Sequence, residues 1–162
     1  MGAQQPRELI TPPNMLKVKV GGSLDAIGKK AIARADMALK AMSTQFVAWL
    51  EEEVEALAQA ITAACKNWNE ETLETVFSLS HNLKGQAATY GSPIVGRIAS
   101  SLCQLLTDED KRTDRPKALV AAHLDSMRLA LRDDIKEEDD PRAQALIKEL
   151  ETVTLHLAPK ED

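Results

Sequence analysis

Apolar residues recur every three or four positions along most of the chain after residue 23, and this spacing restricts the fold more than any other feature. Such spacing places side chains on one face of an α-helix. Only residues 16–20 alternate like a strand, and no second strand-like segment is present to pair with them. The sequence therefore predicts an all-α protein whose helices pack through their apolar faces.

Capping signals and short polar segments divide the predicted helices. We expect helices over residues 24–42, 44–66, 69–90, 93–106, 116–135 and 141–157. Asn69 is a good helix start, and Gly91 a left-handed helix end followed at once by Pro93 in a first helical turn. This tight turn predicts antiparallel neighbours in an up-and-down four-helix bundle. No Pro or Gly breaks the join near residue 43, so residues 24–66 are compatible with one bent helix or two.

The expected organisation is a single helical domain over residues 23–158, with its core bundle at about 46–135. Residues 1–22 contain three prolines and predict an extended or disordered arm, with addition to the edge of a partner's sheet as the alternative. Residues 159–162 are expected to be a frayed tail. The extra helices at about 24–42 and 141–157 either cover the flank of the bundle or form a dimer interface. We expect a monomer.

Composition excludes several classes of partner. The chain has a net charge of −5, which argues against nucleic acid and anionic membrane surfaces. No run approaches the roughly 18 apolar residues of a membrane span, and the start lacks the pattern of a signal peptide. We therefore expect a cytoplasmic protein, with Cys65 and Cys103 as reduced core thiols rather than a disulfide or metal site.

One histidine stands out on the predicted helix 69–90. His81 falls beside an apolar face, with Lys84 three residues later and Gly85 four residues later. Glycine is less favourable than alanine inside a helix by about 0.8–1.0 kcal/mol, so we infer that the space beside His81 is needed. The face itself is formed by Leu73, Val76, Phe77, Leu83 and Ala87.

These residue types predict a particular chemistry. Neutral imidazole is a nucleophile, and an unperturbed histidine side chain is largely neutral near pH 7. Lys84 would suit an anionic group on the ring. His81 is thus predicted to be an exposed histidine that accepts a phosphoryl group. Taken singly, Lys84 is also compatible with an ordinary surface lysine, and Gly85 with close helix packing.

The segment His81-Asn82-Leu83-Lys84-Gly85, with Gly91 ten residues after the histidine, resembles the signature of histidine phosphotransfer (HPt) domains. The similarity covers roughly residues 46–135. It implies a helical bundle in which His81 is the phosphoacceptor, Lys84 lies near the phosphate and Gly85 gives the partner access. It also implies a docking surface, for which the candidate residues here are Gly85, Gln86, Ala88 and Gln104.

Two positions differ from the family pattern. Gln86 stands where many members have a small Ser or Ala, which would alter docking. Many members also have a Glu or Gln on the next helix that hydrogen-bonds the histidine ring. Here the corresponding residue is either Cys103 or Gln104, and the sequence does not separate them.

The resemblance implies a phosphocarrier in a two-component phosphorelay, with response-regulator receiver domains and a hybrid sensor histidine kinase as partners. No cofactor or metal is expected on this chain, and Mg²⁺ is expected on the receiver. A kinase ATP-binding domain is not expected, because no Gly-rich loop with its lysine is present. The protein would be a phosphotransfer intermediate rather than a self-contained enzyme. The alternative is a helical interaction module that binds a regulator or kinase while His81 stays idle.

The remaining polar features predict surface structure. His123 lies beside the apolar stripe of its helix and is expected to be a surface side chain, because no acid or cysteine is at ligand spacing. Residues 107–115 are highly charged and predict an exposed loop. His156 lies near the end of the last helix and carries no further signal.

Overall fold

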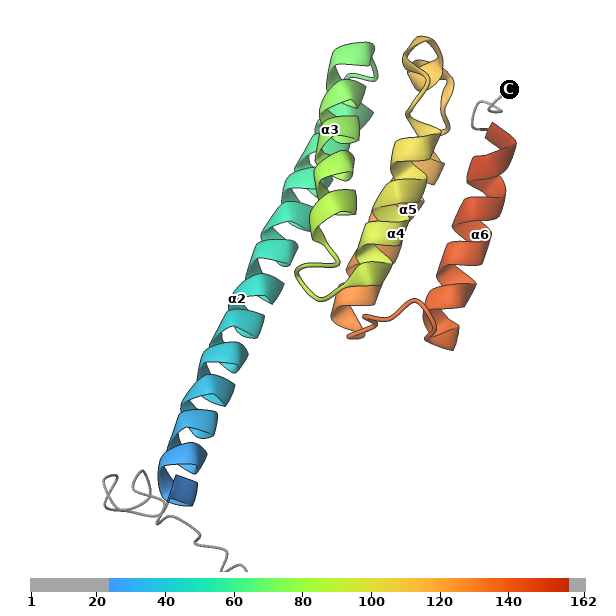
Figure 1. Cartoon of the computed structure of the whole chain (residues 1–162). Coiled ribbons are helices and arrows are strands. Elements are labelled where there is room, and N and C mark those ends of the chain that lie inside the picture. Colours follow the sequence, from blue (N-terminus) through green and yellow to red (C-terminus); the bar gives the residue numbers. More distant parts are fainter. Residues whose placement is uncertain (1–23, 158–162) are drawn as a thin grey trace, which may run out of the picture. The chain divides into compact units, whose positions relative to one another are not determined.

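A computed structural model describes residues 24–157 of the chain, with side chains from residue 28 onward (Figure 1). These residues form helices and turns and contain no strand, so the all-α prediction is confirmed. The predicted arm over residues 1–22 and the predicted tail over residues 159–162 lie outside the described residues. The elements are α2 (Leu24–Lys66), α3 (Glu70–Gln86), α4 (Pro93–Leu105), the 3-10 helix η1 (Glu109–Asp114), α5 (Lys117–Arg132) and α6 (Pro141–Leu157).

Helix α2 is continuous, which answers the question that the sequence left open. Its residues belong to two compact units, 1–41 and 42–162. In the first unit the helical residues 29–41 are all exposed, including large apolar side chains. These are Ile32, Met37 and Leu39.

The second unit has one hydrophobic core. Helix α3 packs against α4, and α4 packs against both α5 and α6, so α4 is central (Figure 1). The apolar stripe of the second part of α2 joins the same core. Side chains that are at most 1% exposed come from all five of these helices and include Leu50, Leu57, Leu73, Val76, Leu83, Ile94, Ile98, Leu102, Leu105, Val120, Met127 and Ala143.

The ends of α3 follow from local sequence. Asn69 accepts a hydrogen bond from the Thr72 N–H at 2.9 Å, and the Thr72 hydroxyl oxygen accepts from the Asn69 N–H, which completes a capping box. The regular helix ends at Gln86, and turns continue it to the left-handed residue Gly91 at φ +85°. The Ser92 N–H donates to the Ala87 carbonyl at 2.9 Å, as in a Schellman motif.

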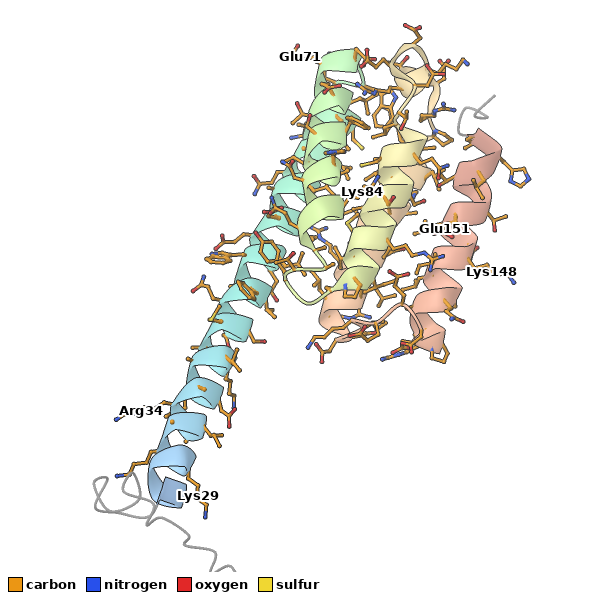
Figure 2. The ribbon with its side chains drawn as sticks, in the orientation of Figure 1. Lys29, Arg34, Glu71, Lys84, Lys148 and Glu151 are labelled. Atoms are coloured by element: carbon orange, nitrogen blue, oxygen red, sulfur yellow. The ribbon has the colours of Figure 1, made fainter. Side chains whose placement is uncertain are left out.

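Ion pairs hold α6 to the bundle. Arg97 on α4 donates to both carboxylate oxygens of Glu151 on α6, at 2.9 and 3.1 Å, and to Glu138 in the preceding loop at 3.0 Å. In Figure 2 Glu151 lies on the side of α6 toward α4, whereas Lys148 points away. Bidentate pairing of this kind adds geometric specificity to the contact between the two helices.

The prediction that His123 is a surface side chain is wrong, because it is 0% exposed. Its Nδ1 lies 2.7 Å from the Leu119 carbonyl oxygen, and its Nε2 lies 3.0 Å from the Ser101 hydroxyl. Thr154 from α6 lies 3.2 Å from the same Ser101 hydroxyl. Since both ring nitrogens have partners, the neutral imidazole can be buried without an unsatisfied polar atom.

Two further expectations are corrected. Residues 107–115 are not an entirely exposed loop, since they include η1 and the buried side chains of Arg112 and Arg115, which are 1% and 8% exposed. Arg112 can be buried because Glu70, Glu74 and a backbone carbonyl accept its hydrogen bonds.

Cys65 is exposed in the last turn of α2, so only Cys103 is a core thiol.

Candidate functional site

His81 lies on the exposed side of α3, between two buried neighbours. Ser80 is 0% exposed and donates its hydroxyl to the Val76 carbonyl at 2.7 Å, and Leu83 is also 0% exposed. These two anchors leave the His81 side chain on the solvent side of the helix. Within the part of the chain that the structure describes, His81 makes no hydrogen bond and has one ring contact, with Phe77 at 6.2 Å between centroids. An accessible imidazole of this kind can act as a nucleophile.

Lys84 is exposed one turn further along α3 (Figure 2). Among residues 28–157 it has no hydrogen bond or ion pair, so its ammonium is available to an incoming anion. Its charge does reach Cys103 on α4: burial raises the pKa of the Cys103 thiol to about 11, and Lys84 opposes this effect. Lys84 therefore adds positive charge to the α3 surface next to α4, on the helix that carries His81.

Gly85 faces open space. A Cβ atom at Gly85 would meet no other atom within 4 Å, so close helix packing does not explain this glycine. The glycine that lies at the contact between α3 and α4 is Gly96 on α4. A Cβ at Gly96 would lie 3.5 Å from both the Ala87 Cβ and the Lys84 carbonyl oxygen. The absence of a side chain at Gly85 thus lowers the outer surface one turn from His81.

The other predicted binding residues are exposed, and they come from two helices. Gln86 and Ala88 follow Gly85 along α3 and its terminal turn, and Gln86 accepts a hydrogen bond from the Tyr90 hydroxyl at 2.9 Å. Gln104 is exposed near the end of α4, whereas Cys103 is 5% exposed. Neither Cys103 nor Gln104 hydrogen-bonds the His81 ring. The ring is therefore oriented without the side-chain acceptor that the resemblance led us to expect.

Sequence reasoning missed the residues that lie behind His81. Phe77 was placed in the core stripe, yet it is only half-buried and its ring contacts His81. Arg112 was placed in an exposed loop, yet its guanidinium lies over the Phe77 ring at 4.6 Å from the centroid. The position of Phe77 four residues before His81 was a usable signal, because i and i+4 side chains meet on a helix. No residue near Arg112 in the sequence predicts its contact with Phe77.

An exposed imidazole beside an ammonium group can accept an anionic group such as a phosphoryl group. The described residues contain no group of three or more His, Cys, Asp or Glu side chains placed to hold a metal ion. None of the helices in residues 24–157 combines the length and apolarity that a membrane span requires. What α3 presents is a histidine, a cation and a gap on one exposed surface.

Comparison with known proteins identifies the family. The Hpt domain pattern matches residues 41–153, which is more than half of the chain and includes α3. Comparisons with curated proteins and with solved structures gave no match. Hpt domains carry phosphoryl groups in phosphorelays and interact with receiver domains and kinases. With its helical bundle and the matched residues, this chain belongs to the Hpt domain family.

Proposed function

We propose that the protein is a phosphocarrier in which His81 accepts a phosphoryl group from a receiver-domain aspartate and passes it to the aspartate of a second receiver. The observation that carries this proposal is the exposed surface of α3, where His81 and Lys84 flank the open position at Gly85. The membership of the chain in the Hpt family supports the class of reaction.

The reaction needs few groups from this chain. The lone pair of His81 Nε2 attacks the phosphorus of the aspartyl phosphate, and the bond from phosphorus to the carboxyl oxygen breaks. The products are a free aspartate carboxylate and a phosphohistidine, whose ring keeps its proton on Nδ1 or loses it to water. Transfer to the second receiver is the same exchange in reverse. Because we expect the receiver to supply most of the polar catalytic groups, this chain contributes mainly the presentation and alignment of the nucleophile.

The neighbouring residues have supporting roles in the proposal. The Lys84 ammonium stabilises the phosphoryl charge, with a modest effect because the pair would be exposed to solvent. Gly85 gives the receiver room to bring its aspartate to the ring, and Gln86, Ala88 and Gln104 contact the receiver surface. We expect the Mg²⁺ to be bound by the receiver and not by this chain.

The test uses a panel of purified receiver domains that have been phosphorylated with labelled acetyl phosphate. Wild-type protein should take up label that is labile in acid and stable in base, as expected of a phosphoramidate. His81→Gln should take up none while it still binds the same receivers. Binding without label in the wild type would instead support the idle interaction module. Absence of both label and binding with every receiver in the panel would contradict the phosphocarrier function and would also contradict a module that binds regulators.

A further inference from the structure

The orientation of the His81 ring must come from packing, because no hydrogen bond holds it among the described residues. Its one ring contact is Phe77, with the two ring planes inclined by 33°. Aromatic rings with centroids 4.5–7 Å apart attract each other in tilted and offset arrangements. A fixed Phe77 would therefore limit the rotamers that His81 can adopt.

Phe77 is in turn held by a buried cation. The Arg112 guanidinium lies over its ring, 4.6 Å from the centroid, and cation–π attraction is strongest where the cation is shielded from water. Arg112 is 1% exposed, so this condition is met. Phe77 thus contacts Arg112 as well as the His81 ring.

Arg112 itself has little freedom. Its Nε donates to the Leu106 carbonyl at the end of α4, and its Nη1 donates to Glu70 at 2.9 Å and to Glu74. Glu70 and Glu74 lie in the first two turns of α3. One guanidinium therefore joins η1, the end of α4 and the start of α3, and contacts the ring next to His81.

We propose that Arg112 and Phe77 are positioning residues for phosphoryl transfer. Arg112 fixes the Phe77 ring, and the Phe77 ring fixes the His81 imidazole so that Nε2, the ring nitrogen farther from the backbone, is presented to the partner. This Arg112–Phe77–His81 contact chain replaces the side-chain acceptor that neither Cys103 nor Gln104 supplies. The proposal rests on the proposed function of His81, and it adds a requirement for the orientation of the ring.

A purely structural role for Arg112 predicts a change in the stability of the fold without a change in the reactivity of His81. If Arg112 only ties η1 to α3 and α4, its removal lowers stability and leaves the chemistry of His81 in the folded protein unchanged. The two roles are separated by measuring which ring nitrogen reacts. A loosely held imidazole exposes Nδ1 as well as Nε2, whereas a held ring exposes one nitrogen.

The experiment uses the full chain with His156→Gln in every protein, so that His81 is the one exposed histidine left, because His123 is buried. Potassium phosphoramidate, a small phosphoryl donor that needs no receiver, is added, and the products are followed by phosphorus NMR. Attack by the ring breaks the phosphorus–nitrogen bond of the donor and releases ammonia. The wild type should give the Nε2 isomer of phosphohistidine. Phe77→Leu and Arg112→Met should react about threefold more slowly, the order of magnitude of one aromatic contact, and should also give the Nδ1 isomer.

A double-mutant cycle tests whether Arg112 acts through Phe77. The Phe77→Leu/Arg112→Met protein should be no slower than Phe77→Leu alone, because residues in one contact chain are not additive. Arg112→Lys keeps the positive charge and should restore part of the isomer preference. The matched control is Arg128→Met, which removes the exposed Arg128–Glu55 ion pair of 3.0 Å on α5 and α2 and should behave as wild type.

The outcomes are distinct. A folded Phe77→Leu protein with wild-type rate and isomer ratio would overturn the positioning proposal, and this variant carries the test if Arg112→Met does not fold. If no phosphorylated receiver transfers label to the wild type, the proposed function is overturned. The contact chain would still be supported if phosphoramidate gave the Nε2 isomer in the wild type and the Nδ1 isomer as well in Phe77→Leu.

Discussion

Nδ1 of His123 lies 2.7 Å from the carbonyl oxygen of Leu119. Because a carbonyl oxygen only accepts, Nδ1 carries a proton, and in the neutral ring Nε2 accepts from the Ser101 hydroxyl at 3.0 Å. Burial favours this neutral form of His123, at a point where side chains of α4, α5 and α6 meet.

Stability should fall in mild acid because of His123. Burial lowers the pKa of this histidine, with a smaller opposing effect from its bond to the Leu119 carbonyl. The unfolded chain then binds more protons than the folded one below an ordinary histidine pKa of about 6.5. The contribution of His123 to the free energy of unfolding is fully present above that pH and is lost as pH falls. The limiting slope of the unfolding free energy is about 1.4 kcal/mol per pH unit. Urea unfolding between pH 7.5 and about pH 5.5 measures it.

The control for this prediction is His123→Gln, which can still bond to Ser101 but does not titrate. Its unfolding free energy should depend less steeply on pH over the same range. His81 and His156 are exposed and are retained in both proteins. Equal slopes for the two proteins would show that His123 is not the group responsible.

Gly85→Ala should separate stability from function. Because a Cβ at Gly85 meets nothing within 4 Å, the variant should unfold with a free energy higher by up to about 0.8–1.0 kcal/mol, the propensity difference between the two residues. It should nevertheless receive phosphoryl groups from receivers more slowly, since the methyl group occupies the proposed approach. Urea unfolding and label transfer are measured on the same preparation.

Gly96→Ala is the matched control for Gly85. It makes the same chemical change in a helix, and its Cβ would form ordinary contacts at 3.5 Å inside the α3–α4 packing. Label transfer should then stay near wild type, because the outer surface is unaltered. If both variants slow transfer equally, the effect is not one of access.

Lys84→Gln should reduce phosphoryl uptake from receivers modestly, by about two- to threefold, since exposed charges are screened by solvent. The loss should shrink as ionic strength rises, because added salt weakens the same attraction in the wild type. Lys148→Gln on α6 removes an equal charge from a side chain that points away from the bundle (Figure 2) and serves as the control. A salt-independent loss would argue against a charge role for Lys84.

Gly91→Ala should destabilise the fold by about 1–2 kcal/mol. Gly91 has φ +85°, a left-handed conformation that costs residues with a Cβ about this much. No neighbouring atom lies within 4 Å of the added methyl group, so the cost comes from the backbone and not from crowding. Thermal unfolding compared with Gly85→Ala tests this, since the two identical changes should shift the midpoint in opposite directions.

The sequence by itself determined the local features of this protein. The spacing of apolar residues predicted the helices, Asn69 and Gly91 marked the two ends of the helix segment that carries His81, and the positions of His81, Lys84 and Gly85 fixed their common helix. All of these depend on contacts within about one helical turn, so the residues involved are close in the chain.

Only the tertiary structure decided which polar side chains are buried and what they contact. His123 is buried because Ser101 and Thr154, 22 and 31 residues away in the chain, complete its surroundings from two other helices. Arg112 reaches Phe77 because η1 folds against the start of α3. A charged residue in a polar segment looks exposed until its distant partners are known. The burial of a polar group is set by partners that meet through packing, and no local spacing encodes them.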